Sequence, residues 1–303
     1  MTPSPEQISI GVSPAVQTLD LTPGETYEGE FFISNLSGSK GVFYHVEVAP
    51  LTFENENYDL SFTDKTDLSQ IVDWIEIENP EGRIGETAPT SIKYKIAVPE
   101  DAPAGGQYAS FLVSGDAGAL NDPSSHGFFI KNNSEIAVQI FSTVAGETRE
   151  EGTVLENSLS PIYLNSPIKV SSLVKNSGNV HTPATYVVEV YPLFSNEPVF
   201  TTEDSPLKNT IIPSTTLYSE KTWDATPLLG VFRVVQTVEI AGEASREETL
   251  TLVSPLWFLI LALAFLASVI FALVDRILRR KKVKKSSSNP PENPEKSLDE
   301  TKP

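Results

Sequence analysis

The residues that could carry out acid–base or nucleophilic chemistry are few and far apart in the sequence. The only histidines are His45, His126 and His181, and the chain contains no cysteine. A serine nucleophile would need a strained turn such as G-x-S-x-G, and neither this motif nor H-E-x-x-H, a P-loop or G-x-G-x-x-G occurs. A pair of carboxylates for glycoside hydrolysis is a spatial feature that no spacing reveals. We therefore predict a protein that is not an enzyme and needs no cofactor.

Acidic and amide side chains could instead hold a cation. Asp64, Asp67, Asp116, Asn121 and Asp122 supply the oxygen ligands that calcium prefers. Their spacing fits neither an EF-hand nor a repeat-type calcium loop, so we interpret them as solvated turn residues and predict no metal site.

Binding residues are expected in the long connections of the chain. Segment 54–70, which is acidic and aromatic, and segment 115–126 are long loops, and long loops on a rigid scaffold are where binding residues gather. A third segment, N-S-G-N-V-H at 176–181, forms a polar turn. We predict that Phe53 and Tyr58 are exposed aromatic side chains able to stack on a ligand. The candidate binding residues are Phe53, Tyr58, Asn121, Asp122, Asn176 and His181.

Strands must position these residues, because apolar and polar side chains alternate along most of the chain. The alternating segments are bounded by Pro, Gly, Asn or Asp, and helical periodicity of ten or more residues is missing before residue 256. Short strands at this spacing are typical of Ig-like β-sandwiches. The predicted strands of the first half are 27–34, 42–48, 71–77, 92–98, 107–114 and 135–144.

An internal repeat indicates two related sandwiches. YHVEVAP at 44–50 and YVVEVYP at 186–192 share the pattern Tyr-x-Val-Glu-Val-x-Pro, and each follows an Asn/Ser/Gly turn. The polar stretch AGETREEG at 145–152 separates the halves. We predict an all-β fold of tandem Ig-like sandwiches over residues 1–147 and 148–253.

A second pair of equivalent positions opens a late strand in each half. Tyr108 follows two glycines just after a Pro-rich corner, where Ig-like sandwiches place a tyrosine whose hydroxyl bonds back to the chain. Phe232 holds the corresponding place after Gly230 but lacks the hydroxyl. We predict that Tyr108 and Phe232 are structural corner residues.

A transmembrane helix is predicted over residues 255–275. Ser268 is the only polar side chain in segment 256–274, and its nineteen residues cover about 28 Å, close to the thickness of a hydrocarbon core. Seven Lys or Arg residues follow within eleven positions, so the positive-inside rule places the C-terminus in the cytoplasm. We expect residues 276–303 to form a basic, disordered tail. The residues expected at the membrane boundaries are Trp257 on the outer side and Arg276, Arg279, Arg280, Lys281 and Lys282 on the inner side.

The same orientation places both sandwiches outside the cell. The segment MTPSPEQISI at the start has no basic or apolar region of a signal peptide, so we expect that a signal was removed or left out. The alternative is a tail-anchored protein with cytosolic sandwiches, which would require the basic tail to cross the membrane, against the charge bias.

Charge restricts the partners. The chain has a net charge of −18, and residues 275–303 alone contribute nine basic against five acidic side chains, so the part before them carries 13 basic and 35 acidic residues. Nucleic acid and anionic lipid both require a cationic face, so we predict neither as a partner of the sandwiches. The absence of cysteine excludes disulfide-stapled domains.

The chain resembles the WxL-interacting surface proteins of Gram-positive bacteria. The resemblance rests on the PGETYEG turn at 23–29, the segments 74–80, 98–108 and 176–181, and the closing helix with its basic tail. It implies an N-terminal Ig-like domain that binds peptidoglycan and a second domain that engages a WxL-domain protein. We predict a membrane-anchored bacterial cell-surface protein that binds a cell-wall glycan or another surface protein. The alternative is a scaffold or accessory subunit of a membrane assembly, in which the small residues of the helix permit close helix contact.

Overall fold

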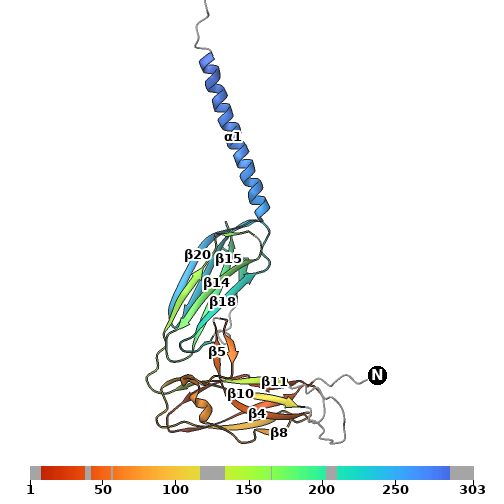
Figure 1. Cartoon of the computed structure of the whole chain (residues 1–303), viewed down its shortest axis with the longest axis vertical. Coiled ribbons are helices and arrows are strands. Elements are labelled where there is room, and N and C mark those ends of the chain that lie inside the picture. Colours follow the sequence, from red (N-terminus) through yellow and green to blue (C-terminus); the bar gives the residue numbers. More distant parts are fainter. Residues whose placement is uncertain are drawn as a thin grey trace, which may run out of the picture.

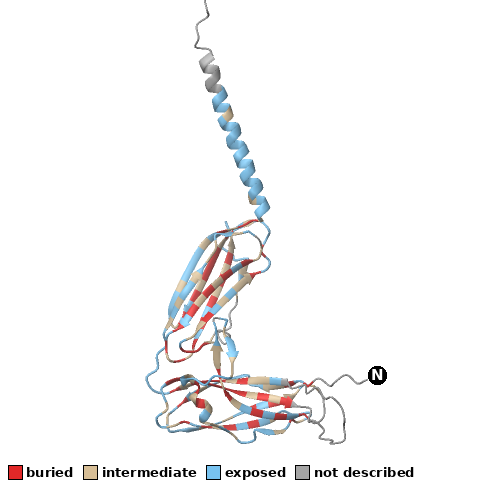
Figure 2. Cartoon of the chain, in the orientation of Figure 1, coloured by how far each residue is buried: buried red, intermediate tan, exposed pale blue. Residues whose placement is uncertain are grey.

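Alternating strands build two β-sandwiches, and one long helix follows them (Figure 1). The computed structural model describes residues 8–37, 42–55, 57–116, 134–164, 166–202 and 210–286. Within both sandwiches buried and exposed residues alternate along the strands, whereas the helix is exposed along its apolar length (Figure 2). The expected fold class, tandem Ig-like sandwiches with a C-terminal helix, is confirmed.

The first sandwich pairs a four-stranded with a five-stranded sheet. The four-stranded sheet has the order β1 (Ile10–Ser13), β3 (Thr26–Asn35), β9 (Thr90–Ala97) and β7 (Ile75–Ile77). The five-stranded sheet has the order β2 (Val16–Leu21), β11 (Ser134–Val144), β10 (Gly105–Asp116), β4 (Phe43–Pro50) and β8 (Glu81–Arg83).

The core of the first sandwich lies between these sheets. The rings of Phe31 and Phe111 stack with centroids 4.9 Å apart, and Tyr94 tilts against Phe111 at 4.8 Å. All three side chains are fully buried or nearly so. Aromatic contacts between the facing sheets therefore add to the Ile and Val packing of a core that has no disulfides.

Between β4 and β7 the chain forms a hairpin and a short helix, where a longer strand was expected. The hairpin consists of β5 (Thr52–Glu54) and β6 (Asp59–Ser61), and η1 (Asp67–Asp73) is a 3₁₀ helix. Thr66 and Ser69 form a reciprocal capping box at the start of η1. The predicted strand 71–77 is therefore wrong in its first half, because the cap favours a helical turn and leaves only Ile75–Ile77 extended.

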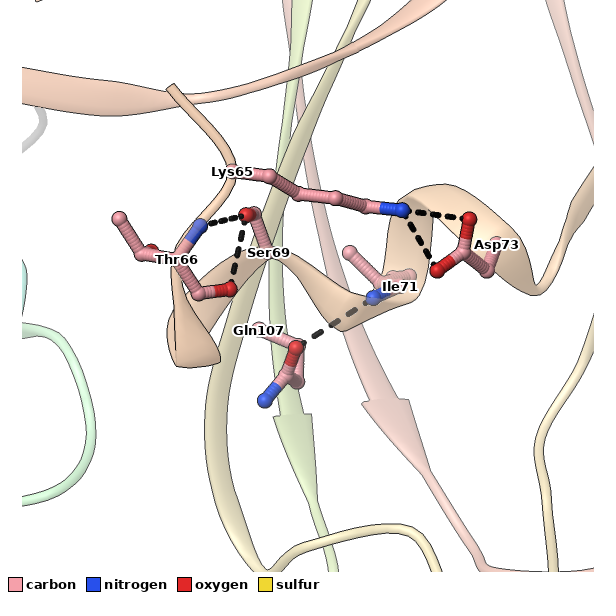
Figure 3. A network of polar contacts seen from close by, with 6 residues as sticks. All are labelled: Lys65, Thr66, Ser69, Ile71, Asp73 and Gln107. Carbon is pink, nitrogen blue, oxygen red and sulfur yellow. Dashed lines mark hydrogen bonds and ion pairs between the residues drawn. The ribbon is translucent and has the colours of Figure 1, made fainter.

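Buried Gln107 attaches η1 to β10 (Figure 3). Its side-chain oxygen accepts a hydrogen bond from the Ile71 N–H at 3.3 Å, and its amide nitrogen donates to the Asp67 carbonyl at 3.0 Å. Lys65 pairs with Asp73 across the helix at 2.6 Å. The segment that leads out of the β5–β6 hairpin is thus fixed on the sandwich.

The second sandwich repeats the topology of the first. One sheet has the order β12 (Gly152–Ser158), β14 (Ile168–Asn176) and β18 (Thr216–Trp223). The other has the order β13 (Ile162–Tyr163), β20 (Glu243–Val253), β19 (Gly230–Ile240), β15 (Thr182–Pro192) and β16 (Phe200–Thr201), with β17 (Thr210–Ile211) paired to β15. In both sandwiches a parallel pair, β2–β11 or β13–β20, joins the first part of the chain to the last strand.

The sequence repeat occupies the same place in both sandwiches. Its two copies form β4 and β15, and each pairs antiparallel with the late strand, β10 or β19. Tyr44 and Tyr186, which begin the copies, are both buried. The shared pattern therefore specifies equivalent central strands.

Helix α1 (Leu256–Ser286) begins three residues after β20 ends. Residues Leu256–Arg279 have a mean hydropathy of 2.8 in their most apolar window, none of which is buried, so this helix is long and apolar enough to span a membrane. Residues 276–286 are helical although we expected a disordered tail from 276. Lys and Arg are good helix formers, so the basic run continues the apolar helix.

Candidate interdomain site

A polar turn of the second sandwich holds the connection between the two sandwiches. Asn179 accepts a hydrogen bond from the Arg149 N–H at 2.6 Å and donates from its side chain to the Glu147 carbonyl at 2.8 Å. Its own carbonyl accepts from the Gly106 N–H of β10 at 2.7 Å. One residue thus contacts both the connection and the first sandwich.

Asn176, a predicted binding residue, stabilises this turn. Its side-chain nitrogen donates to the carbonyls of Val180 and Ile211 at 2.8 and 2.7 Å, and its oxygen accepts from the Gly178 N–H at 2.9 Å. The side chain is fully buried. Because its hydrogen-bonding groups are occupied by the backbone, Asn176 orders the turn that carries Asn179 and His181.

An aromatic cluster lies where the sandwiches meet. The ring of His181 packs edge-on against Tyr108 at 5.8 Å and against Phe141 at 5.5 Å. Leu51 and Ile212 complete the buried part of this cluster. Tyr108, expected at a corner within one sandwich, therefore packs across the boundary between two.

The β5–β6 hairpin projects from the first sandwich toward the second (Figure 1). Phe53 and Tyr58 stack on it with centroids 3.8 Å apart. The Tyr58 hydroxyl accepts a hydrogen bond from the Ile212 N–H of the second sandwich at 2.6 Å. Both rings, expected to be exposed, are half-buried, because the second sandwich covers part of the hairpin.

A cleft of about 650 Å³ opens between the hairpin and the two sandwiches. Its lining is mostly apolar. Alternate residues of neighbouring strands form one wall, because Val16 pairs with Gln139 and Thr18 with Phe141. The lining residues are Val16, Thr18, Phe53, Asn57, Tyr58, Leu60, Gln139, Phe141, His181, Pro183, Thr210 and Leu217.

Burial dominates the electrostatics of the cleft. It raises the pKa of Tyr58 to about 12 and raises the pKa of Tyr108 as well. It lowers the pKa of His181 from its ordinary value of 6.5, while the carboxylates of Asp20 and Glu150 act in the opposite direction. The Nδ1 atom of His181 is buried and has no hydrogen-bond partner within the described part of the chain. These groups are therefore neutral at pH 7 and suited to packing rather than to proton transfer.

The structure brings together Phe53, Tyr58 and His181 among the predicted binding residues. Asn121 and Asp122 lie outside the described residues. Phe232 is buried in the second sandwich, where its ring meets Trp223 edge-on at 5.1 Å. Within the described ranges no group of three His, Asp or Glu residues could hold a metal ion.

The residues that we expected at the two membrane boundaries all belong to α1. Trp257 stands in its first turn and is exposed. Arg276 and Arg279 are exposed, and Arg279 pairs with Asp275 at 2.7 Å. Arg280, Lys281 and Lys282 belong to the same helix.

Apart from His181, sequence reasoning missed the residues that the second sandwich contributes to the cleft. Thr210 and Leu217 belong to β17 and β18, and the Ile212 backbone binds Tyr58 from the turn between these strands. Isolated apolar residues in short strands give no signal of a site.

The sequence matches no family model, and no curated protein is detectably similar to it. Similar solved structures include the Salmonella enterica SafA pilin in complex with the SafB chaperone, with 10% identity, coverage of 82% of this chain and 98% of that chain, and a TM-score of 0.39. The Pseudomonas aeruginosa CupB2 chaperone has 10% identity, coverage of 77% and 97%, and a TM-score of 0.36. The E. coli chaperone DraB has 10% identity, coverage of 80% and 98%, and a TM-score of 0.35. Identities this low assign no ligand to the chain.

Proposed function

We propose that this chain is a non-enzymatic, membrane-anchored cell-surface protein of the WxL-interacting type, and that it binds another surface protein at the interdomain cleft. The cleft is the observation that carries the proposal. It is mostly apolar and has the size of a typical ligand site. Aromatic side chains such as Phe53 and Tyr58 are enriched where proteins bind protein partners.

The sheet beside the cleft favours a polypeptide ligand. β2 is an outer strand, and among the described strands only β11 pairs with it. An outer strand offers backbone donors and acceptors to an extended segment, while pockets beside it receive alternate side chains. Val16 and Thr18 of this strand line the cleft.

The location at the cell surface is supported by α1 and by charge. The apolar segment Leu256–Arg279 is long enough to cross a bilayer, and the basic residues follow it. In the proposed orientation the basic end lies in the cytoplasm and the acidic sandwiches lie outside. The helix then keeps the cleft within two domain lengths of the membrane.

A cell-wall glycan such as peptidoglycan is the second candidate ligand. The rings of Phe53 and Tyr58 lie beside the amides of Asn57 and Gln139 in the same cleft. Aromatic rings next to hydrogen-bonding groups suit a sugar, which presents both apolar faces and hydroxyls.

The test uses the detergent-solubilised full chain and two leucines of the first sandwich. Leu60 lines the cleft, whereas Leu36 is exposed and does not line it. We expect Leu60→Arg to abolish capture of a surface protein from solubilised envelopes and Leu36→Arg to leave it intact, because only the first places a charge in the apolar site.

Sedimentation with purified peptidoglycan distinguishes the two ligands. Loss of sedimentation in Leu60→Arg alone would favour the glycan. If both variants bind every ligand as the unaltered chain does, the cleft is not the binding site. Binding that depends on α1, and fails when an unrelated anchor replaces it, would favour the scaffold of a membrane assembly.

A further inference from the structure

The end of the second sandwich from which α1 departs carries exposed apolar side chains. Phe194 is 97% exposed and Leu228 is 73% exposed. They come from different connections, β15 to β16 and β18 to β19. We call this set the apolar rim; it consists of Leu164, Leu193, Phe194, Leu228 and Leu229.

Strand pairing places the rim at the base of α1. Gly230, which follows Leu229 directly, pairs with Val253, and Tyr163, which precedes Leu164, pairs with the same residue. Pro192, which precedes Leu193, pairs with Phe232 in the next register positions of β19. All three connections therefore lie at the end of the sandwich where β20 passes into the helix, far from the first sandwich (Figure 1).

The base of the helix is held by hydrogen bonds. The Ser254 N–H donates to the Tyr163 carbonyl at 2.9 Å, and the Ser254 side chain is fully buried. Thr226 accepts from the Ile168 N–H at 3.1 Å, and its carbonyl accepts from the Ser166 hydroxyl at 2.9 Å. Two of the three connections that carry the rim are thus attached to the sandwich, so Leu164, Leu228 and Leu229 have a defined position relative to the start of α1.

The equivalent end of the first sandwich is covered by another part of the protein. Leu51 follows Pro50 as Leu193 follows Pro192, and Leu51 is fully buried in the aromatic cluster that the second sandwich covers. Leu193 is 41% exposed. Within the described part of the chain, nothing covers the second end as the second sandwich covers the first.

The position of α1 indicates that a lipid bilayer covers the rim. Taking α1 as the membrane span of the proposed function, Trp257 lies at the outer boundary of the bilayer, and the rim lies at the end of the sandwich from which the helix departs. The three connections, 159–168, 192–199 and 224–231, contain no Lys or Arg. Contact with lipid would therefore be apolar insertion, not attraction to anionic headgroups.

We infer that the apolar rim inserts into the outer interface of the bilayer around α1 and seats the second sandwich on the membrane. Apolar groups of interfacial proteins enter about 5–10 Å into the boundary between headgroups and acyl chains. The membrane then fixes the tilt of the sandwich. Without this contact, the tilt would depend only on the short connection between β20 and α1. This inference rests on the proposed membrane anchoring.

The test is depth-dependent quenching on the full chain reconstituted in neutral phosphatidylcholine vesicles that contain nitroxide-labelled lipid. Because the chain has no cysteine, single variants accept one NBD label each. Phe194→Cys and Leu228→Cys report on the rim. Leu155→Cys, exposed midway along β12, is the control outside the membrane, and Leu263→Cys in α1 is the control within it.

We expect the labels at 194, 228 and 263 to lose most of their fluorescence to the nitroxide lipid and the label at 155 to keep it. Two rim positions guard against a variant that fails to fold. Quenching at 263 without quenching at 194 or 228 would overturn the seating of the sandwich and leave the anchor intact. An unquenched label at 263 would overturn the anchor itself and the seating with it.

Discussion

The two sandwiches share a topology but use the same end for different contacts. In the first, the loop before β10 ends at Ala104 and β10 begins at Gly105, which allows the Asn179 backbone to approach. In the second, the loop before β19 carries Leu228 and Leu229, which are exposed. Small residues admit a neighbouring backbone, whereas bulky apolar residues fill the space and remain available to another surface. A few loop residues therefore decide what each sandwich contacts.

The aromatic residue that follows each loop shows the same division. Gly106 and Gly230 leave room for the rings of Tyr108 and Phe232, which lie over them. Tyr108 contacts His181 across the boundary between sandwiches, whereas Phe232 contacts Trp223 within its own. Tyr108 thus lies where the two sandwiches meet, with its buried hydroxyl lacking a hydrogen-bond partner among the described residues, and Phe232 lies in the core of one sandwich.

The largest expected difference is in the free energy of unfolding, between alanine substitutions at Leu51 and at Leu193. Leu51→Ala should lower the free energy of unfolding by about 3 kcal/mol, because it leaves a cavity in a fully buried cluster. Leu193→Ala should cost less than about 1 kcal/mol in detergent solution, because its side chain is partly exposed. Chemical denaturation measures both values, and equal losses would show that the two ends are not used differently.

Two glycines with positive φ test the close approach at the joint. Gly105→Ala should cost about 3 kcal/mol, because the residue has a φ of +119° and a Cβ would meet the Asn179 carbonyl oxygen at 2.6 Å. Gly242→Ala should cost about 1 kcal/mol, because this glycine has a φ of +81° but open space around it. Thermal unfolding reports the difference, and a smaller effect at Gly105 would contradict the packed joint.

Tyr58→Phe removes the hydrogen bond between the hairpin and the second sandwich. We expect a loss of about 1 kcal/mol, because the Ile212 N–H then lacks this acceptor. Hydrogen exchange at Ile212 should accelerate accordingly. Tyr218→Phe, at an exposed position on β18, is the control and should leave this exchange unchanged.

His181 gives the smallest expected effect, a dependence on pH. Burial lowers its pKa in the folded protein, so the unfolded chain binds the proton more readily. The joint is therefore most stable above pH 6.5, and stability falls as the pH drops from there through the lower folded pKa. His181→Gln should flatten this acidic fall in denaturation experiments, whereas His45→Gln, at an exposed position, should retain it. If the stability of His181→Gln still falls at acidic pH, titration of groups other than His181 causes the fall.

Local patterns predicted the strands better than the site. Alternation and the Tyr-x-Val-Glu-Val-x-Pro repeat identified the equivalent strands β4 and β15, because both signals arise within a few residues. η1 escaped prediction because a cap and the distant Gln107 stabilise it. Helical continuation past residue 275 was missed because the polar, Pro-rich composition of the end of the chain was taken to apply to the basic run as well.

The candidate residues were found singly and not as a group. Phe53, Tyr58 and His181 are brought together by the packing of two sandwiches, and their separation in sequence contains no trace of that packing. Asn176 was recognised as important, but its side chain serves the backbone. The apolar rim gave no sequence signal, because single Leu and Phe residues in loops are ordinary until their positions converge.

The parallel strand pairs determine how the protein would carry mechanical tension. A pull between α1 and a ligand held at the cleft enters the second sandwich through the end of β20, whose parallel contact is limited to Ile162 and Tyr163. The corresponding contact in the first sandwich extends along β2 from Val16 to Leu21. Hydrogen bonds loaded along the strands in shear must break together, so the longer pair resists a greater force. We expect the sandwich next to the membrane to extend first under load and so shield the ligand-bearing joint from rupture.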